Sequence, residues 1–411
     1  RAVHLVHRQE RGGSWSTRHI VRVGLIMKPV ALTLAFAVVT TGIAPHALSA
    51  HATAHAAHGM AITVDSGYIV NTDGSVGDFV GTYTSGLQQL IDDSYPTITT
   101  SDFSSISIFN ATELRYLTLK GDASTDGHSY LSDVTLQLPS MFVLTLEGSM
   151  GVAPNATLKS DVTPPMVALD GVSYSAVLGG TYDATGNTTY EAIRIKDGSH
   201  CKVEGVTGYG SGTNIIEVHN GNRHEISHST LDGGDAAFRC IWLLATNHGL
   251  VHFNYATRCV GHVIDFDAYT SNSAAWSNVA EYNNPTGVGE GIFVEETATN
   301  NFIFNNTASN NGGNGIALYS SVVGPVTGNI IAANTAENNA GHGLSSGGYG
   351  HDPVKHAGDN IFVGNTASGN SGNDLQIMHG AAINDYWTGN DGGYTYDEDP
   401  HSSANVTVFE P

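Results

Sequence analysis

Lys196 and His219 have side chains whose type and spacing suggest acid–base chemistry. Each ends a short run rich in β-branched residues, and the two positions are 23 residues apart. If these runs are neighbouring strands, the two side chains lie about 5 Å apart. A lysine and a histidine at that distance could act as base and acid in a β-elimination, while Arg194 or Arg239 neutralises the carboxylate of a uronate sugar.

Acidic residues follow in the next segments of the same region. Asp265, Asp267, Glu295 and Glu296 could together bind Ca²⁺, which prefers oxygen ligands. Alternatively, Asp267 and Glu295 at about 5 Å would suit a retaining glycosidase, whereas His219 and Asp267 at about 10 Å would leave room for a water molecule. The sequence leaves both chemistries open beside the elimination.

Aromatic side chains accompany these charged groups and suggest a glycan surface. Aromatic faces stack on sugar rings, and charged groups bind hydroxyls or carboxylates. The residues expected to bind substrate are Arg194, Glu217, Arg239, Trp242, Asp265 and Tyr319. Two simpler interpretations remain: a binding surface without catalysis, and an ordinary solvated sheet face.

A repeat places these residues beside one another. Asn-Thr-Ala recurs at 306, 334 and 365, and a glycine precedes an apolar run at 291, 315 and 343. Apolar runs begin at 167, 193, 216, 241, 264, 292, 316 and 344. A period of 20 to 30 residues without amphipathic helices is typical of a solenoid. We expect a parallel β-helix with two or three short strands per coil, stacked asparagine amides, and glycines that supply left-handed backbone at the corners.

The alternation of a strand then predicts which side chains face outward. With the isoleucines of each run pointing inward, two outward columns result. The first contains Arg194, Glu217, Trp242, Asp265, Phe293 and Ala317. The second contains Lys196, His219, Leu244, Asp267, Glu295 and Tyr319.

The composition agrees with an all-β solenoid. Glycine accounts for 49 of 411 residues, and only 13% of residues are charged, which disfavours helical bundles and coiled coils. The 40% of hydrophobic residues suffices for a large core, so disorder of the whole chain is excluded.

The N-terminal part predicts secretion. Met27 and Lys28 precede an apolar run that ends in small residues, as in a signal peptide over 27–54, and residues 1–26 are expected not to belong to the native protein. Without 1–54 the chain keeps 10 basic and 37 acidic residues. That charge argues against nucleic acid or an anionic membrane as a partner, and we expect a secreted, extracellular monomer.

Three cysteines, Cys201, Cys240 and Cys259, allow at most one disulfide in an oxidising compartment. We choose Cys240 with Cys259. A glycoprotein is expected if the source adds sugars at Asn-x-Ser/Thr sites. These sites are Asn110, Asn155, Asn187, Asn305 and Asn405.

On this repeat, roughly residues 105 to 380 resemble the pectin-lyase-like superfamily of right-handed parallel β-helices. That superfamily includes polysaccharide lyases, polygalacturonases, alginate epimerases and phage tailspikes. The resemblance implies a single-stranded right-handed solenoid of roughly 10 to 12 coils. We expect an N-terminal segment and cap over 55–104, with a short helix at 87–91, the β-helix over 105–383, and a tail or second cap over 384–411.

Motifs of individual branches are only partly present. Gly-His-Gly at 341–343 and Arg-Ile-Lys at 194–196 resemble polygalacturonases, but in that family the second follows the first by about one coil, and here it precedes it. The segment 349–353 resembles the mannuronan epimerase signature, with Val354 where that family has histidine. Neither motif selects a reaction.

Together these observations predict a secreted carbohydrate-active protein that binds a polysaccharide and cleaves it by β-elimination. The expected catalytic residues are Lys196, His219, Asp267 and Glu295, and Ca²⁺ is the expected cofactor. A non-catalytic glycan-binding or adhesion protein is the alternative, followed by a glycoside hydrolase or uronan epimerase.

Overall fold

The structure is a computed structural model that describes most residues between 61 and 409. The described ranges are 61–65, 68–71, 76–78, 84–94, 114–121, 128–153, 164–185, 191–210, 212–283, 289–320, 323–348, 357–377, 382–396 and 407–409. The expected start at Met27, the signal peptide at 27–54 and most of the glycosylation sites lie outside them. Asn305 is described and is exposed.

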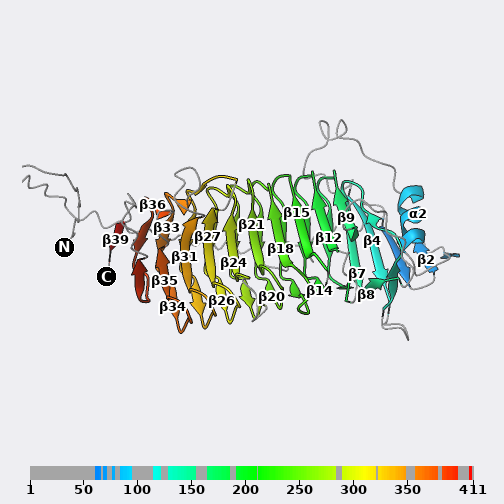
Figure 1. Ribbon diagram of the computed structural model, residues 1–411. Coiled ribbons are helices and arrows are strands. Elements are labelled where there is room, and N and C mark those ends of the chain that lie inside the picture. Colours follow the sequence, from blue (N-terminus) through cyan, green and yellow to red (C-terminus); the bar gives the residue numbers. More distant parts are fainter. Residues whose placement is uncertain are drawn as a thin grey trace, which may run out of the picture. The chain divides into compact units, whose positions relative to one another are not determined.

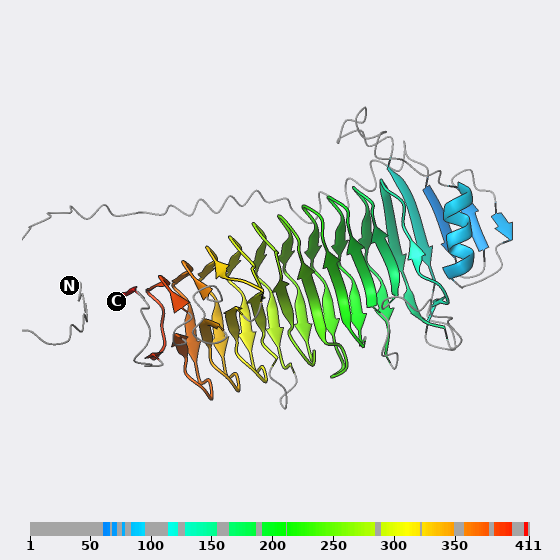
Figure 2. The same cartoon turned by 45° about the horizontal axis from the view of Figure 1, so that its top comes forward.

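Short strands dominate this part of the chain, and successive coils stack in parallel (Figures 1 and 2). Among the described residues the strands form sheets of 15, 10, 11 and 3 strands, which we call sheets A, B, C and D. Each coil between residues 115 and 377 contributes one strand to each of the three large sheets. The predicted all-β parallel helix is therefore confirmed.

Sheet C carries the residues expected to do chemistry. Its strands in spatial order are β6 (Leu136–Gln137), β9 (Pro165–Asp170), β12 (Glu191–Lys196), β15 (Asn214–His219), β18 (Arg239–Leu244), β21 (Ile264–Asp267), β24 (Ile292–Glu295), β27 (Ile316–Ser320), β31 (Leu344–Gly348), β35 (Leu375–Ile377) and β38 (Tyr394–Tyr396).

Sheets A and B form the other two large faces. Sheet A contains β3 (Val76–Asp78), β2 (Tyr68–Asn71), β1 (Ala61–Asp65), β4 (Arg115–Lys120), β7 (Phe142–Glu147), β10 (Ala176–Leu178), β13 (Lys202–Glu204), β16 (Glu225–Ser227), β19 (Leu250–His252), β22 (Ala274–Trp276), β25 (Phe302–Phe304), β29 (Ile330–Ala332), β33 (Ile361–Val363), β37 (Tyr386–Thr388) and β39 (Thr407–Phe409). Sheet B contains β5 (Tyr130–Ser132), β8 (Ser149–Val152), β11 (Thr181–Asp183), β14 (Thr207–Tyr209), β17 (Thr230–Asp232), β20 (Tyr255–Thr257), β23 (Val279–Glu281), β26 (Thr307–Ser309), β30 (Thr335–Glu337) and β34 (Thr366–Ser368). The small sheet D contains β28 (Val326–Thr327), β32 (Ala357–Gly358) and β36 (Ala382–Ile383).

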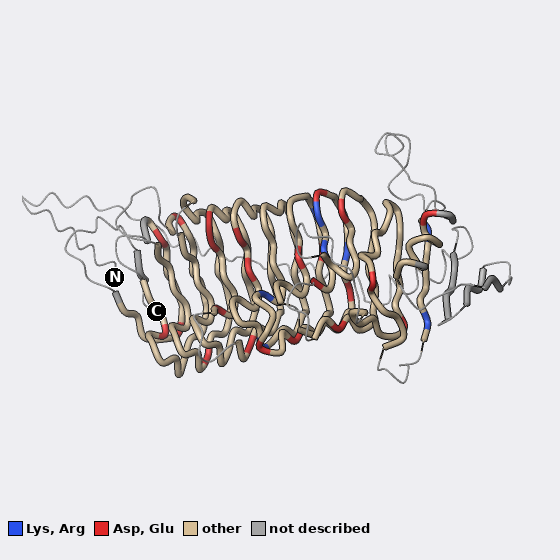
Figure 3. The backbone as a smooth tube through the Cα atoms, turned by 45° about the vertical axis from the view of Figure 1, so that its right-hand side comes forward, with Lys and Arg blue, Asp and Glu red and all other residues tan. Residues whose placement is uncertain are grey.

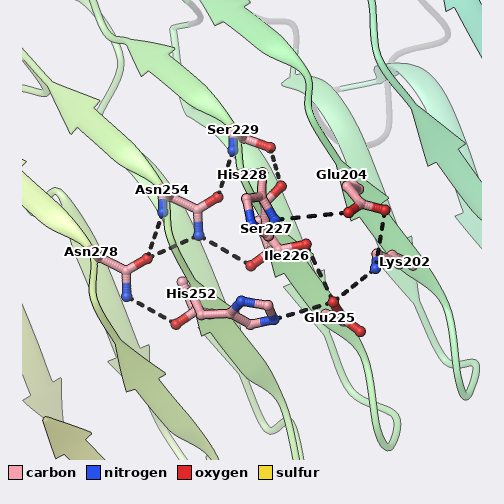
Figure 4. A network of polar contacts seen from close by, with 11 residues as sticks. Lys202, Glu204, Glu225, Ile226, Ser227, His228, Ser229, His252, Asn254 and Asn278 are labelled. Atoms are coloured by element: carbon pink, nitrogen blue, oxygen red, sulfur yellow. Dashed lines mark hydrogen bonds and ion pairs between the residues drawn. The ribbon is translucent and has the colours of Figure 1, made fainter. Parts of the chain in front are cut away.

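Asparagine ladders run along the corners of the coils. The amide of Asn254 donates to Asn278 at 3.0 Å, and that of Asn278 donates to Asn306 at 2.9 Å (Figure 4 shows the first pair). The same contact continues from Asn306 to Asn334 at 3.0 Å. All are buried, so each amide satisfies polar groups that water does not reach. The predicted stacking of asparagine amides is confirmed.

Glycines and asparagines both supply left-handed backbone at the corners. Gly364 and Gly369, each directly before an asparagine, have φ of 63° and 67°, and Asn300 and Asn305 have φ of 57° and 55°. A Cβ on Gly291 would lie 2.6 Å from the amide nitrogen of Asn311 and 2.7 Å from the carbonyl oxygen of Gly315. Glycine is therefore required there because the next coil approaches closely, which is a second role beside the left-handed corners that the sequence predicted.

At the N-terminal end, the expected short helix is confirmed and is longer than predicted. Helix α2 (Thr84–Ser94) buries Leu87 and Ile91 and packs on β5 and β6. Thr84 donates to the carbonyl of Val134 at 2.6 Å. Beyond β4, the strands β1 to β3 extend sheet A, and β1 pairs in parallel with β4. Among the described residues, no helix is both long and apolar enough to span a membrane.

At the C-terminal end, strand pairing continues beyond residue 383, where we expected a tail or cap. β37 pairs with β33, β38 with β35, and β39 with β37, all in parallel. The last turns of the solenoid are therefore built from residues that the sequence pattern did not include in the repeat.

The predicted disulfide is present. Cys240 and Cys259 are bonded, with their Cα atoms 5.9 Å apart, and Cys201 is a buried free thiol. Cys240 is the second residue of β18, so the bond fixes the start of a strand that carries site residues.

Candidate functional site

The two outward columns of sheet C have the register that the repeat predicted. The paired positions of the first are Arg194, Glu217, Trp242, Asp265, Phe293 and Ala317. In the second, Lys196, His219, Leu244 and Asp267 are paired in that order, and Glu295 is paired with Tyr319. The intervening isoleucines are buried in the core.

Much of this surface is covered by its own side chains. Asp265 is 0% exposed and Phe293 is 7% exposed, whereas Asp267 and Glu295 keep 13% and 14% of their side chains accessible. An ordinary solvated sheet face does not explain a carboxylate that is completely buried at its centre. We therefore take this region as the candidate site.

Three carboxyl groups converge on one arginine, and we call Arg239, Asp265, Asp267 and Glu295 the carboxylate cluster. Nε of Arg239 donates to Oδ2 of Asp265. Nη2 of the same guanidinium lies 3.5 Å from Oδ2 of Asp267 and 3.8 Å from Oε1 of Glu295. The strands β18, β21 and β24 are consecutive in sheet C, so the stacking of coils brings these groups together.

Aromatic rings hold the guanidinium of Arg239 in place. Its central carbon lies 4.6 Å from the ring centroid of Trp242 and 4.7 Å from that of Phe238, within the range of cation–π contacts. Trp242 also donates from Nε1 to Oδ2 of Asp267 at 3.0 Å. Trp242 and Arg239 together thus fix the position of the Asp267 carboxyl group.

The cluster contains more carboxyl groups than its guanidinium can neutralise. Burial raises the pKa of Asp265, although Arg239 and His262 oppose the shift. Burial also raises the pKa of Glu295, and the charges of Asp265 and Asp267 raise it further, well above its usual range. Glu295 therefore favours its protonated form more than an exposed glutamate does, while remaining partly accessible.

His262 belongs to this site, and the sequence analysis missed it. Its Nδ1 lies 2.8 Å from Oε2 of Glu290, and its ring lies 4.4 Å from that of Phe293. One ligand atom each from His262, Asp265 and Glu295 lie within 4.8 Å of one another. His262 and Glu290 lie two positions before the apolar runs that begin at 264 and 292. Extending the outward columns by two positions toward the N-terminus of each strand would therefore have predicted both residues.

At the other end of the columns, Arg194 is committed to a neighbour. Its Nε and Nη2 atoms donate to the two carboxylate oxygens of Asp170 at 3.2 and 2.5 Å. Burial lowers the pKa of Arg194, but the hydrogen bond and charge of Asp170 outweigh burial and raise it. A guanidinium in a bidentate ion pair is a poor receptor for a substrate carboxylate.

The expected base and acid of an elimination are neighbours. Lys196 and His219 are directly paired in the register of β12 and β15. Nδ1 of His219 lies 3.4 Å from Oε1 of Glu217, whose other oxygen accepts from Asn214 at 3.2 Å. These contacts place His219 beside a buried carboxylate. Lys196 and His219 remain neighbours in the outward column, as the repeat predicted.

The four acids expected to bind Ca²⁺ do not form one set. Oε2 of Glu296 accepts from the backbone N–H of Val323 at 2.9 Å. Arg239 contacts one oxygen of each of the other three acids. Ca²⁺ takes about six to eight oxygen ligands, so it would need further oxygens beside those of these acids. Tyr319, expected to bind substrate, stacks on Phe293 with ring centroids 6.5 Å apart.

A second ionic network lies on sheet A (Figure 4). Lys202 lies 3.1 Å from Glu204 and 2.9 Å from Glu225, and Nε2 of His252 lies 3.1 Å from Glu225. Burial would raise the pKa of Glu225, but the hydrogen bonds from His252 and Lys202 lower it to about 2. Each charged group of this network has a partner within the network, which indicates a structural role.

The family-like motifs do not converge on the cluster. Nδ1 of His342 accepts from the backbone of Asn373 at 2.8 Å, so it supports the next coil. Residues 349–353, which resemble the epimerase signature, lie outside the described residues.

Comparison with known proteins confirms the handedness of the fold. Residues 183–331 match the family described as right handed beta helix region. No curated protein sequence matches the chain significantly. The chain has the right-handed parallel β-helix fold.

Several solved structures are similar. The tailspike protein of E. coli bacteriophage HK620, in complex with a pentasaccharide, is 14% identical with a TM-score of 0.55, over 79% of this chain and 61% of that one. The Dettilon tailspike protein is 13% identical with a TM-score of 0.53, over 81% and 68% of the two chains. The endo-xylogalacturonan hydrolase from Aspergillus tubingensis is 13% identical with a TM-score of 0.51, over 72% and 91%. At these identities the likeness concerns the fold alone.

Proposed function

We propose that this right-handed parallel β-helix is a carbohydrate-active enzyme that hydrolyses glycosidic bonds of a polysaccharide at the carboxylate cluster. The observation that carries the proposal is the convergence of Asp267 and Glu295 around Arg239, beside the ring of Trp242. Two accessible carboxyl groups from adjacent coils are the residue pair that glycoside hydrolysis requires.

The environments of the two carboxyl groups assign their roles. Glu295 favours its protonated form and donates its proton to the glycosidic oxygen as the bond to the anomeric carbon breaks. Asp267, fixed by Trp242 and Arg239, either removes a proton from the attacking water or attacks the anomeric carbon itself. The anomer first released distinguishes these two routes. Asp265 is fully buried and positions Arg239.

The charges of the site favour a neutral glycan. Arg194 and Arg239, expected to bind a uronate carboxylate, are both paired with acids of the protein. Basic residues are few along the coils, and acidic ones occur throughout (Figure 3). A polyanionic polymer would be repelled, since the whole chain has a formal charge of −22. The proposal includes secretion, because polymeric glycans of this kind occur outside the cell.

The similar structures support a glycan as substrate without identifying it. One is a tailspike in complex with a pentasaccharide, and another is by name a hydrolase of xylogalacturonan. A groove that binds a glycan without cleaving it is the remaining alternative, and turnover decides between them.

β-Elimination is a second candidate, favoured by the direct pairing of Lys196 with His219. It requires a free cation to neutralise the uronate carboxylate, and the contacts of Arg194 argue against this. Elimination leaves an unsaturated uronate that absorbs ultraviolet light, so the two reactions are separated in one assay.

The test incubates the purified protein with a panel of neutral and uronate-containing polysaccharides and follows both new reducing ends and unsaturated uronate. We expect reducing ends without ultraviolet absorbance. Glu295→Gln should lower the rate about 10²- to 10⁴-fold, the usual contribution of a positioned general acid. The control is Glu337→Gln on sheet B, which should retain full activity.

Other outcomes would reject the proposal. Ultraviolet absorbance that is lost in Lys196→Ala would favour elimination. Retained glycan binding without any new chain ends, in the native protein and both glutamine variants, would identify a binding protein.

A further inference from the structure

His262, Asp265 and Glu295 offer three ligand atoms that the proposed hydrolysis does not explain as a set. They come from the segment before β21, from β21 itself and from β24, and the ligand atoms lie within 4.8 Å of one another. One nitrogen and two carboxylate oxygens are a donor set used by divalent transition metals, and His and Glu are ligands of catalytic zinc.

Asp265 provides an independent indication of a missing ligand. Its side chain is completely buried, and Oδ2 is bonded to Arg239. Its second oxygen, Oδ1, is buried without any hydrogen-bond partner. A buried carboxylate oxygen without a partner is costly, and a cation placed between it and Glu295 would satisfy it.

The second nitrogen of His262 is available because the first is occupied. Nδ1 is occupied by Glu290, whose Oε2 lies 2.8 Å away and whose backbone N–H donates to it at 3.3 Å, so Nε2 is the ring nitrogen left for a metal. A carboxylate at the other ring nitrogen of a histidine is the usual support of a metal ligand, since it holds the orientation of the ring.

The charges also favour a cation. Three carboxyl groups, from Asp265, Asp267 and Glu295, surround the guanidinium of Arg239, and a fourth, from Glu290, contacts His262. Arg239 contacts one oxygen of each of the three acids, so Ca²⁺ would have to take most of its six to eight oxygen ligands from other groups. A four-coordinate ion needs only three protein ligands and a water molecule.

We propose that His262, Asp265 and Glu295 bind one Zn²⁺ ion. The ion would occupy the carboxyl group of Glu295 that the glycosidic oxygen must reach, so Zn²⁺ inhibits the hydrolysis. The inhibitory effect depends on the proposed function, whereas binding does not.

The experiment measures binding without reference to activity. Protein stripped with a chelator is dialysed against ZnCl₂, and bound zinc is determined by elemental analysis. We expect one ion per chain in the native protein. His262→Ala and the supporting variant Glu290→Gln should each weaken binding at least about tenfold. His342→Ala, three coils further along the same column, should bind like the native protein.

Folding is checked independently. Zn²⁺ should raise the melting temperature of the native protein and of His342→Ala, and it should not raise that of His262→Ala. Native protein that binds no zinc, or His262→Ala that binds as tightly as native, overturns the site. If zinc binds and the rate of hydrolysis stays unchanged, then Glu295 does not serve both as a zinc ligand and in hydrolysis. Absence of hydrolysis on every glycan rejects the proposed function and leaves the binding result valid.

Discussion

Arg239 shows how one residue can hold a site together. It is 14% exposed and contacts three carboxyl groups, one of which, Asp265, has no access to water. A buried ion pair gives little net stabilisation compared with apolar residues, but removal of one partner leaves an uncompensated buried charge. The guanidinium therefore matters more for holding the three acids in position than for stabilising the folded protein beyond what apolar residues would do.

We predict that Arg239→Ala destabilises the protein by about 3 to 5 kcal/mol, because Asp265 loses its only bonded partner among the described residues. Urea unfolding measures the change. The control is Arg258→Ala, whose side chain is 49% exposed and pairs with Asp232. That variant should lose no more than about 1 kcal/mol, as exposed ion pairs do. Equal losses in the two variants would contradict the buried role of Arg239.

At the level of elements, the asparagine ladders determine how closely coils can stack. One ladder runs from Asn329 to Asn360 and ends at Asp385. Oδ1 of Asp385 accepts from Asn360, and its other oxygen contacts Ser346. A carboxyl thus occupies a position that an amide fills in the preceding coils. Burial raises the pKa of Asp385 to about 7, and its hydrogen bonds only partly oppose this.

We predict that Asp385→Asn stabilises the protein increasingly as the pH rises. The folded state holds the proton of Asp385 more tightly than the unfolded state, so wild-type stability falls between about pH 4 and pH 7, whereas asparagine does not titrate. The advantage of the variant should grow by about 2 to 4 kcal/mol across this range, at roughly 1.4 kcal/mol per pKa unit. Thermal or urea unfolding at several pH values measures it.

Asp391→Asn provides the matched control, because Asp391 is exposed on a neighbouring turn. Its effect on stability should be small and the same at every pH. A loss of stability in Asp385→Asn at alkaline pH would mean that the contact with Ser346 requires a carboxylate.

The sequence predicted these elements better than the contacts between them. The period of the apolar runs correctly placed Trp242 beside Asp265, since in a parallel stack the register follows directly from strand alternation. The sequence did not predict that Arg194 forms an ion pair with Asp170, or that Glu296 accepts a hydrogen bond from the backbone of Val323. Those choices depend on side-chain rotation and on corner geometry, which vary from coil to coil and have no periodic signal.

At the scale of the whole molecule, each coil contacts only its two neighbours. The stability of such a stack is approximately the sum of coil and interface terms, and a terminal coil has one interface fewer. Phe266 of β21 is buried in the middle of the stack, and Trp387 of β37 is buried near its C-terminal end. Trp387 stacks on Phe362 of the preceding coil with ring centroids 3.8 Å apart.

We therefore predict different consequences of truncating these two rings. Each removal should cost about 3 to 5 kcal/mol at its own site. In Trp387→Ala, faster amide exchange should be confined to β33 and the strands that follow it, because the outer coils separate without disturbing the rest. In Phe266→Ala, coils on both sides should lose protection, because a central interface is shared by two neighbours. Hydrogen exchange followed by mass spectrometry resolves the two patterns, and a uniform loss of protection in Trp387→Ala would show that the stack unfolds as a single cooperative unit.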